Sequence, residues 1–160
     1  MSIQHNHLHN ALTVAGRVLL ASLFIPAGIN KVTNFAGTVE FVSTSGVPFP
    51  EVAVGAAALI EIIAGLAVLI GFHVRWGAVA LSLFTLLASV LFHAYWAATP
   101  DQQYVTQLLF FKNIAVIGGL LSLAAAGPGA WSVTSYLKHH HTEPHNDHAE
   151  HQHHVAPLPH

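Results

Sequence analysis

The sequence contains no cysteine and very few charged residues. Without cysteine the chain cannot form a disulfide, a thiolate metal site or a thiol redox relay of its own. Charged residues make up 8% of the chain and hydrophobic residues 53%, whereas soluble globular proteins typically have about 25% charged residues. Five Lys and Arg residues in all also exclude the basic field that nucleic-acid binding needs. The composition therefore predicts a membrane protein and no nucleic-acid partner.

The chain contains four long runs of apolar residues. Each is close to the length of about 20 residues that crosses about 30 Å of hydrocarbon, and in lipid such runs must be helices. We therefore predict an all-α polytopic membrane protein, a bundle of four transmembrane helices in the bacterial inner (plasma) membrane. The four runs cover about residues 11–29, 51–71, 76–97 and 106–126.

The segments between and beyond these runs complete the predicted organisation. The loop after the first run has Asn34 as a helix cap and Phe35, Val39 and Val42 at helical spacing, which predicts a short amphipathic helix at the membrane interface. "MSIQHNHLHN" has no Lys or Arg, so the first run is expected to be retained, not cleaved. The predicted divisions are a histidine-containing N-terminal tail (1–10), the membrane domain (11–137) and a disordered histidine-rich tail (138–160).

An even number of spans predicts that both termini lie on the same side of the membrane. Cations on the terminal side outnumber those on the other side by three to two, which favours termini in the cytoplasm. The three are Arg17, Arg75 and Lys138, and the two are Lys31 and Lys112.

Glu61 is a carboxylate in the middle of the second run, "ALIEIIAGLAVLIG". A central aspartate costs about 2.5–3.5 kcal/mol on helix-insertion scales, and glutamate is expected to be similar. Ala57, Ala58, Ala64 and Gly65 surround it on one helix face, and small residues let helices approach closely. Glu61 is therefore expected to face the bundle interior and to pair with either Arg17 or Lys112.

Each predicted helix also carries one stripe of small and polar residues, and four such stripes facing one another predict a polar interior. On the fourth helix the stripe is Lys112, Ala115, Gly119 and Ser122. This interior could be a binding pocket, or it could hold only a structural ion pair that fixes helix packing. The residues assigned to the polar bundle pocket are Arg17, Lys31, Glu61, Ser89, His93, Lys112 and Asn113.

Nine of the fourteen histidines fall from His139 onward. Neutral imidazoles bind zinc, nickel and copper, so this tail is a candidate metal site, physiological or adventitious. The candidate ligands are His139, His140, His141, His145, His148, His151, His153 and His154.

The sequence resembles the DoxX family of small four-helix membrane proteins across residues 15–132. The matching segments are "GRVLLASLFIPAGINKV", "GVPFP", "EIIAGLAVLIGFHVRWGAVAL", "FH" and "FFKNIAVIGGLLSLAAAGPG". The resemblance implies that Arg17, Lys31, Glu61, Arg75, His93, Lys112 and Asn113 are the recurrent polar positions. Some members of this family serve as a membrane subunit of thiosulfate:quinone oxidoreductase, and another belongs to a redox-stress complex, so the resemblance is compatible with a role of this kind. The histidine-rich tail is not part of the family pattern.

Two classes of function follow from these features. The first is an accessory subunit of a membrane redox complex that binds quinone or a small anion in the pocket and depends on a partner protein, because the chain has no self-sufficient catalytic motif. The second is a non-enzymatic scaffold, transport or metal-responsive protein. A homo-oligomer is compatible with both.

Overall fold

The computed structural model describes residues 2–141 of the 160-residue chain and shows an all-α protein with no strand in that range. Four long helices form the body, and shorter helical elements follow the first, third and fourth of them. The long helices are α1 (Ser2–Thr33), α3 (Pro50–Ile70), α4 (Val74–Phe92) and α5 (Gln103–Ala126), and the short ones are α2 (Phe35–Thr44), η1 (Tyr95–Ala97) and α6 (Val133–His141).

Four segments of this body are long and apolar enough to cross a membrane, which confirms the predicted polytopic membrane protein. They are Asn6–Thr33, Pro50–Ile70, Val74–Ala97 and Gln103–Ala126. The predicted first span was too short, because α1 begins at Ser2 and includes most of the predicted N-terminal tail. The α6 helix, which was not predicted, continues through His141, so the predicted disorder from residue 138 is wrong for 138–141. The rest of that tail lies outside the described residues.

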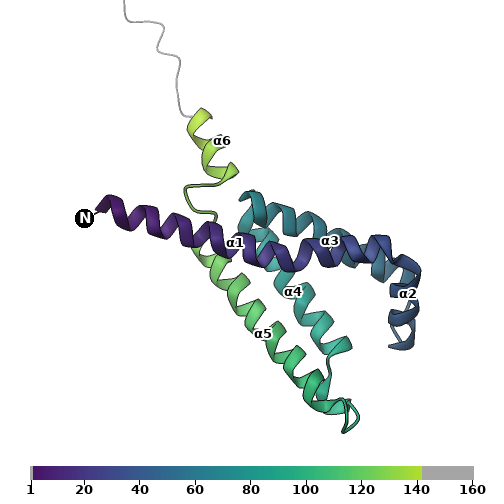
Figure 1. The fold of residues 1–160 in the computed structure, drawn as a ribbon. Coiled ribbons are helices and arrows are strands. Elements are labelled where there is room, and N and C mark those ends of the chain that lie inside the picture. Colours follow the sequence, from purple (N-terminus) through teal and green to yellow (C-terminus); the bar gives the residue numbers. More distant parts are fainter. Residues whose placement is uncertain (1, 142–160) are drawn as a thin grey trace, which may run out of the picture.

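The long helices are arranged as two antiparallel pairs, α1 with α3 and α4 with α5. A tight turn joins α3, which ends at Ile70, to α4, which begins at Val74. Figure 1 shows the two pairs together near α6 and diverging toward the end that carries α2 and the α4–α5 connection. The two ends of the bundle therefore differ in structure, because the helix pairs lie together at one end and separate at the other.

Close contact between α1 and α3 depends on two glycines that lie in the crossing. A Cβ added to Gly28 would lie 2.7 Å from Cγ1 of Ile62, and one added to Gly65 would lie 2.9 Å from Cγ1 of Ile25. Both distances are shorter than carbon atoms tolerate, so each glycine admits a side chain of the opposite helix. The crossing brings Gly28 of α1 beside Glu61 of α3.

The central core between the pairs is an apolar cluster, and the buried polar residues Arg17, Glu61, Ser82, Thr85 and Ser89 lie outside that cluster. Its buried cluster consists of Phe24, Val68, Val74, Ala78, Leu81, Leu120 and Leu123. On α5, Leu120 and Leu123 face this cluster, and the predicted stripe of Lys112, Ala115, Gly119 and Ser122 is exposed. Most of the stripe predicted on α1 is buried, namely Arg17, Ala21, Phe24 and Gly28, and Lys31 at its end is partly exposed. On α4 the predicted residues Ser82, Thr85 and Ser89 are buried, whereas His93 and Trp96, which follow the helix, are partly exposed and exposed, respectively.

The short helix α2 confirms the predicted helix in the first loop. Asn34 stands at its N-cap position but makes no capping hydrogen bond with its side chain. Val42 is buried against the bundle, and the ring of Phe41 lies 5.7 Å, centroid to centroid, from that of Phe92 at the end of α4. The α2 helix therefore spans the diverging end between the two helix pairs.

Candidate functional site

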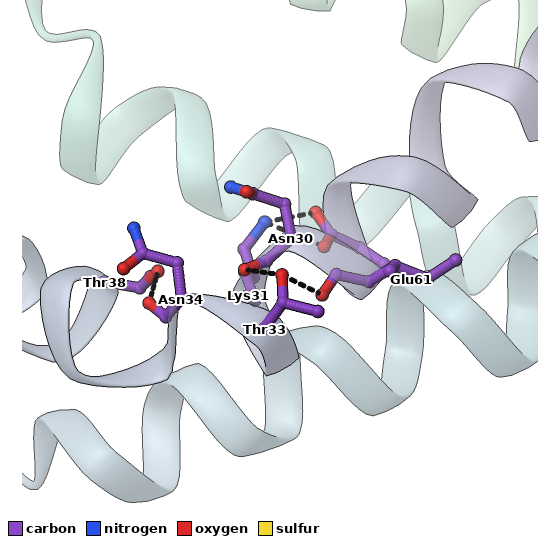
Figure 2. Close-up of polar contacts among 7 residues, drawn as sticks. Asn30, Lys31, Thr33, Asn34, Thr38 and Glu61 are labelled. Carbon is purple, nitrogen blue, oxygen red and sulfur yellow. Dashed lines mark hydrogen bonds and ion pairs between the residues drawn. The ribbon is translucent and has the colours of Figure 1, made fainter.

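The carboxylate of Glu61 is paired with Lys31, which projects from the last turn of α1. The Nζ of Lys31 donates to both carboxylate oxygens of Glu61, at 2.9 Å to Oε1 and 2.7 Å to Oε2. Figure 2 shows the two side chains pointing toward one another from neighbouring helices. The Glu61 side chain is only 6% exposed and that of Lys31 is 24% exposed. This pair supplies the buried carboxylate with the charge-assisted hydrogen bonds that it needs.

The predicted partners of Glu61, Arg17 and Lys112, are therefore wrong. The sequence does not show how far α1 is shifted along α3, and this shift decides which cation lies beside Glu61. Because α1 continues to Thr33, Lys31 lies within the helix and not beyond its end. Lys31 is also one turn after Gly28, the residue that touches Glu61, and so shares its face. Arg17 precedes Lys31 by about 21 Å of helix at 1.5 Å per residue.

Arg17 instead lies at the opposite end of the bundle, where it joins separate segments of the chain. Its Nη1 donates to the carbonyl oxygens of Pro128 at 2.7 Å and Trp131 at 2.9 Å, and its Nη2 donates to that of Leu69 at 3.1 Å. The carbonyl of Leu69 belongs to the last turn of α3, where a cation is favoured by the helix dipole. The buried Nε has no hydrogen-bond partner within residues 2–141, which reduces the stabilisation that the other hydrogen bonds of Arg17 provide. Arg17 thus ties α1 to α3 and to the segment after α5.

Gly71 makes room for this arrangement. It ends α3 in the left-handed region, with φ +79°. A Cβ at this position would lie 2.5 Å from Cβ of Ser132 and 2.8 Å from Nη1 of Arg17. A larger residue would therefore be strained by its backbone conformation and would also displace the guanidinium group.

A cavity of about 480 Å³ lies at the diverging end of the two helix pairs. Helices α1 to α5 all contribute to its wall, which is mostly aliphatic and aromatic. The apolar lining residues include Leu23, Phe24, Phe41, Val42, Val54, Phe84, Leu91 and Phe92. Its size lies within the range of about 300–1,000 Å³ that is typical of small-molecule sites.

Polar groups from three of the long helices and from the end of α4 converge on this cavity. Five of the seven predicted pocket residues line it, namely Lys31, Glu61, His93, Lys112 and Asn113. Ser89 lies directly behind them, fully buried, and accepts a hydrogen bond from Nδ2 of Asn113 at 2.9 Å. Arg17 is not part of the lining. The structure therefore brings together the predicted polar residues of one end of the bundle and leaves out the one at the other end.

The contribution of α2 to the site was missed by the sequence analysis. Thr38, Phe41 and Val42 of α2 line the cavity, although the helix was predicted only to lie at the interface. The three residues fall on one face at helical spacing, but that pattern alone does not distinguish a lipid-facing surface from a cavity wall.

The predicted metal site stays a prediction. No group of three or more histidine, cysteine, aspartate or glutamate residues within the described part of the chain could hold a metal ion. His145 and the candidate ligands that follow it lie outside the described residues. His139, His140 and His141 belong to α6.

Comparisons with known proteins agree on one family. The model of the DoxX family matches residues 12–94. Inner membrane protein YqjF of Escherichia coli is 39% identical over 133 residues, which cover 81% of this chain and 95% of that protein. Inner membrane protein YphA of the same organism is 34% identical over 122 residues, covering 76% of this chain and 87% of that protein. No solved structure matches the chain.

A more distant similarity extends to a longer protein. The Surfeit locus protein 4 homolog of Schizosaccharomyces pombe is 28% identical over 135 residues, which cover 81% of this chain but only 40% of that protein.

Proposed function

The chain belongs to the DoxX family of integral membrane proteins, and from this premise we propose that it is an accessory subunit of a membrane redox complex that holds a quinone in the cavity. One observation carries the proposal. The cavity has mostly apolar walls and a smaller number of polar lining groups, which is the usual form of a site for an amphipathic ligand. A quinone has this character, because its ring and tail are apolar and its carbonyl oxygens accept hydrogen bonds.

The polar lining residues include hydrogen-bond donors for the carbonyl oxygens of a quinone. Lys112 can donate to a carbonyl oxygen, and His93 can donate to one or exchange a proton with it near neutral pH. Asn113 already donates one hydrogen bond to Ser89, so it helps to shape the site. The chain would bind and orient the quinone, and because it has no cysteine and no self-sufficient catalytic motif, a partner protein would deliver the electrons.

Filling the cavity should weaken quinone binding. Ala88 of α4 lines the cavity, so Ala88→Phe should weaken binding of a short-chain benzoquinone by at least about tenfold, equivalent to about 1.4 kcal/mol. Ala115→Phe is the matched control, because Ala115 is exposed on α5 and does not line the cavity. Titration calorimetry of protein in lipid nanodiscs would measure both affinities.

Equal loss of binding in both variants, or no binding by the unmodified protein, would contradict the proposal. Mass spectrometry of the protein extracted with its native lipid should also detect copurified quinone and a redox partner. Their absence would favour the scaffold or transport alternative.

We further propose that the protein lies in the inner membrane with both termini in the cytoplasm. The absence of native cysteine allows single cysteines to be labelled without background. In spheroplasts, an impermeant maleimide should label Asp101→Cys, in the α4–α5 connection, and should label Asn6→Cys only after permeabilisation. The reverse pattern would show the opposite orientation, and labelling of both from outside would contradict the three spans that separate the two positions.

A further inference from the structure

The side chains that line the cavity include one more positive charge than negative charge. Its ionisable lining residues are Lys31, Glu61, His93 and Lys112. Both carboxylate oxygens of Glu61 accept hydrogen bonds from Lys31, so these two charges cancel. His93 is neutral or cationic and cannot offset a lysine. Lys112 is therefore the cation without a counter-charge in the lining.

Lys112 is also placed where an uncompensated charge is costly. It follows the first residue of α5 by about 14 Å at 1.5 Å per residue, well inside the membrane-spanning segment. It forms no hydrogen bond or ion pair with any residue in the described part of the chain. Ionisable residues at such depth in a membrane usually mark a ligand or ion pathway.

Among the residues that the structure describes, no other carboxylate is positioned to pair with Lys112. Glu40 and Glu51 are exposed on α2 and α3 and do not line the cavity. Asp101 is exposed in the connection before α5 begins, and a hydrogen bond from Thr99 lowers the pKa of its carboxyl group. The described residues thus leave the ammonium group of Lys112 without a carboxylate partner beside a mostly apolar cavity.

We propose that the cavity takes an acidic amphiphile, whose apolar body fills the space between the helix pairs and whose negatively charged oxygen pairs with Lys112. This inference rests on the proposed function, since it specifies the charge of the ligand in the same cavity. An ionised hydroxyquinone and a fatty-acid carboxylate share this chemistry. Lys112 would then distinguish an acidic ligand from a neutral one of the same shape, because a hydrogen bond to an ionised group is stronger than one to a neutral group.

Two pairs of probes that differ in charge test the inference in nanodiscs of zwitterionic lipid. The first pair is 2-hydroxy-1,4-naphthoquinone and 1,4-naphthoquinone, and the second is dodecanoate and dodecanol. The acidic member of at least one pair should bind about tenfold or more tightly than its neutral counterpart. Preference in the first pair alone identifies an acidic quinone as the ligand class. Preference in the second pair alone identifies a fatty acid, which supports the acidic ligand and contradicts the proposed quinone.

The preference should disappear in Lys112→Met and persist in Lys112→Arg. Arg75→Gln is the matched control, because it removes an exposed cation that does not line the cavity, and it should leave the preference unchanged. Equal affinity for acidic and neutral probes in both pairs would overturn the inference and leave the proposed binding function standing. A preference that survives in Lys112→Met would also overturn it. No binding of any probe would overturn both.

Discussion

Glu61→Gln should lower the free energy of unfolding by about 3 kcal/mol, the lower end of the range of about 3–5 kcal/mol for breaking a buried ion pair. The carboxylate is 6% exposed and its partner 24% exposed, so Lys31 would be left charged and only partly hydrated. The lower end applies because the exposed part of Lys31 can still reach water. Reversible unfolding in mixed micelles with increasing dodecyl sulfate would measure the loss.

A double-mutant cycle identifies the partner. Lys31→Gln combined with Glu61→Gln should recover part of the loss, with a coupling energy of about 1–3 kcal/mol. Arg17→Gln and Lys112→Gln should combine additively with Glu61→Gln, because neither cation contacts the carboxylate. Glu51→Gln removes an exposed carboxylate from the first turn of the same helix and should have little effect. Coupling with Lys112 instead of Lys31 would show that the pair is wrongly assigned.

Arg17→Gln should be at least as destabilising, by about 3 kcal/mol or more. The side chain is nearly fully buried and donates three hydrogen bonds to main-chain carbonyls. Hydrogen bonds to a charged group contribute about 1.5–3 kcal/mol each, and these bonds are partly buried, so water would replace them only in part. Arg17→Lys should also be destabilising, because one ammonium group lacks the planar fork that reaches carbonyls on two segments.

Hydrogen exchange would show where this second loss acts. The amides of residues 129–137 should lose protection in Arg17→Gln, because Arg17 holds the segment between α5 and α6 against α1 and α3. Arg75→Gln is the control, since Arg75 is exposed near the same end of the bundle, and surface substitutions usually change stability by less than about 0.5 kcal/mol. Equal effects of the two substitutions would contradict a role for Arg17 in joining the helices.

The sequence was sufficient for the four long helices, for α2 and for most of the polar residues of the site, but not for α6. The buried faces of α1 and α4 follow the predicted stripes, as Arg17 and Ser89 show. The prediction failed for α5, where the small and polar stripe from Lys112 to Ser122 is exposed. Small and apolar residues can pack against lipid tails as well as against another helix, so a stripe of such residues does not by itself identify the inner face of a membrane helix.

The sequence by itself determined the number of spans, because a membrane demands about 20 apolar residues per crossing and satisfied backbone groups, and both requirements are local. It also determined that Glu61 needs a cation, because a buried charge is costly wherever it lies. Only the tertiary structure decided that the cation is Lys31 and that α2 closes the cavity against the diverging helices. Both depend on how far one helix is shifted and tilted against the next. That offset is set by contacts such as Gly28 against Ile62, between residues far apart in the chain.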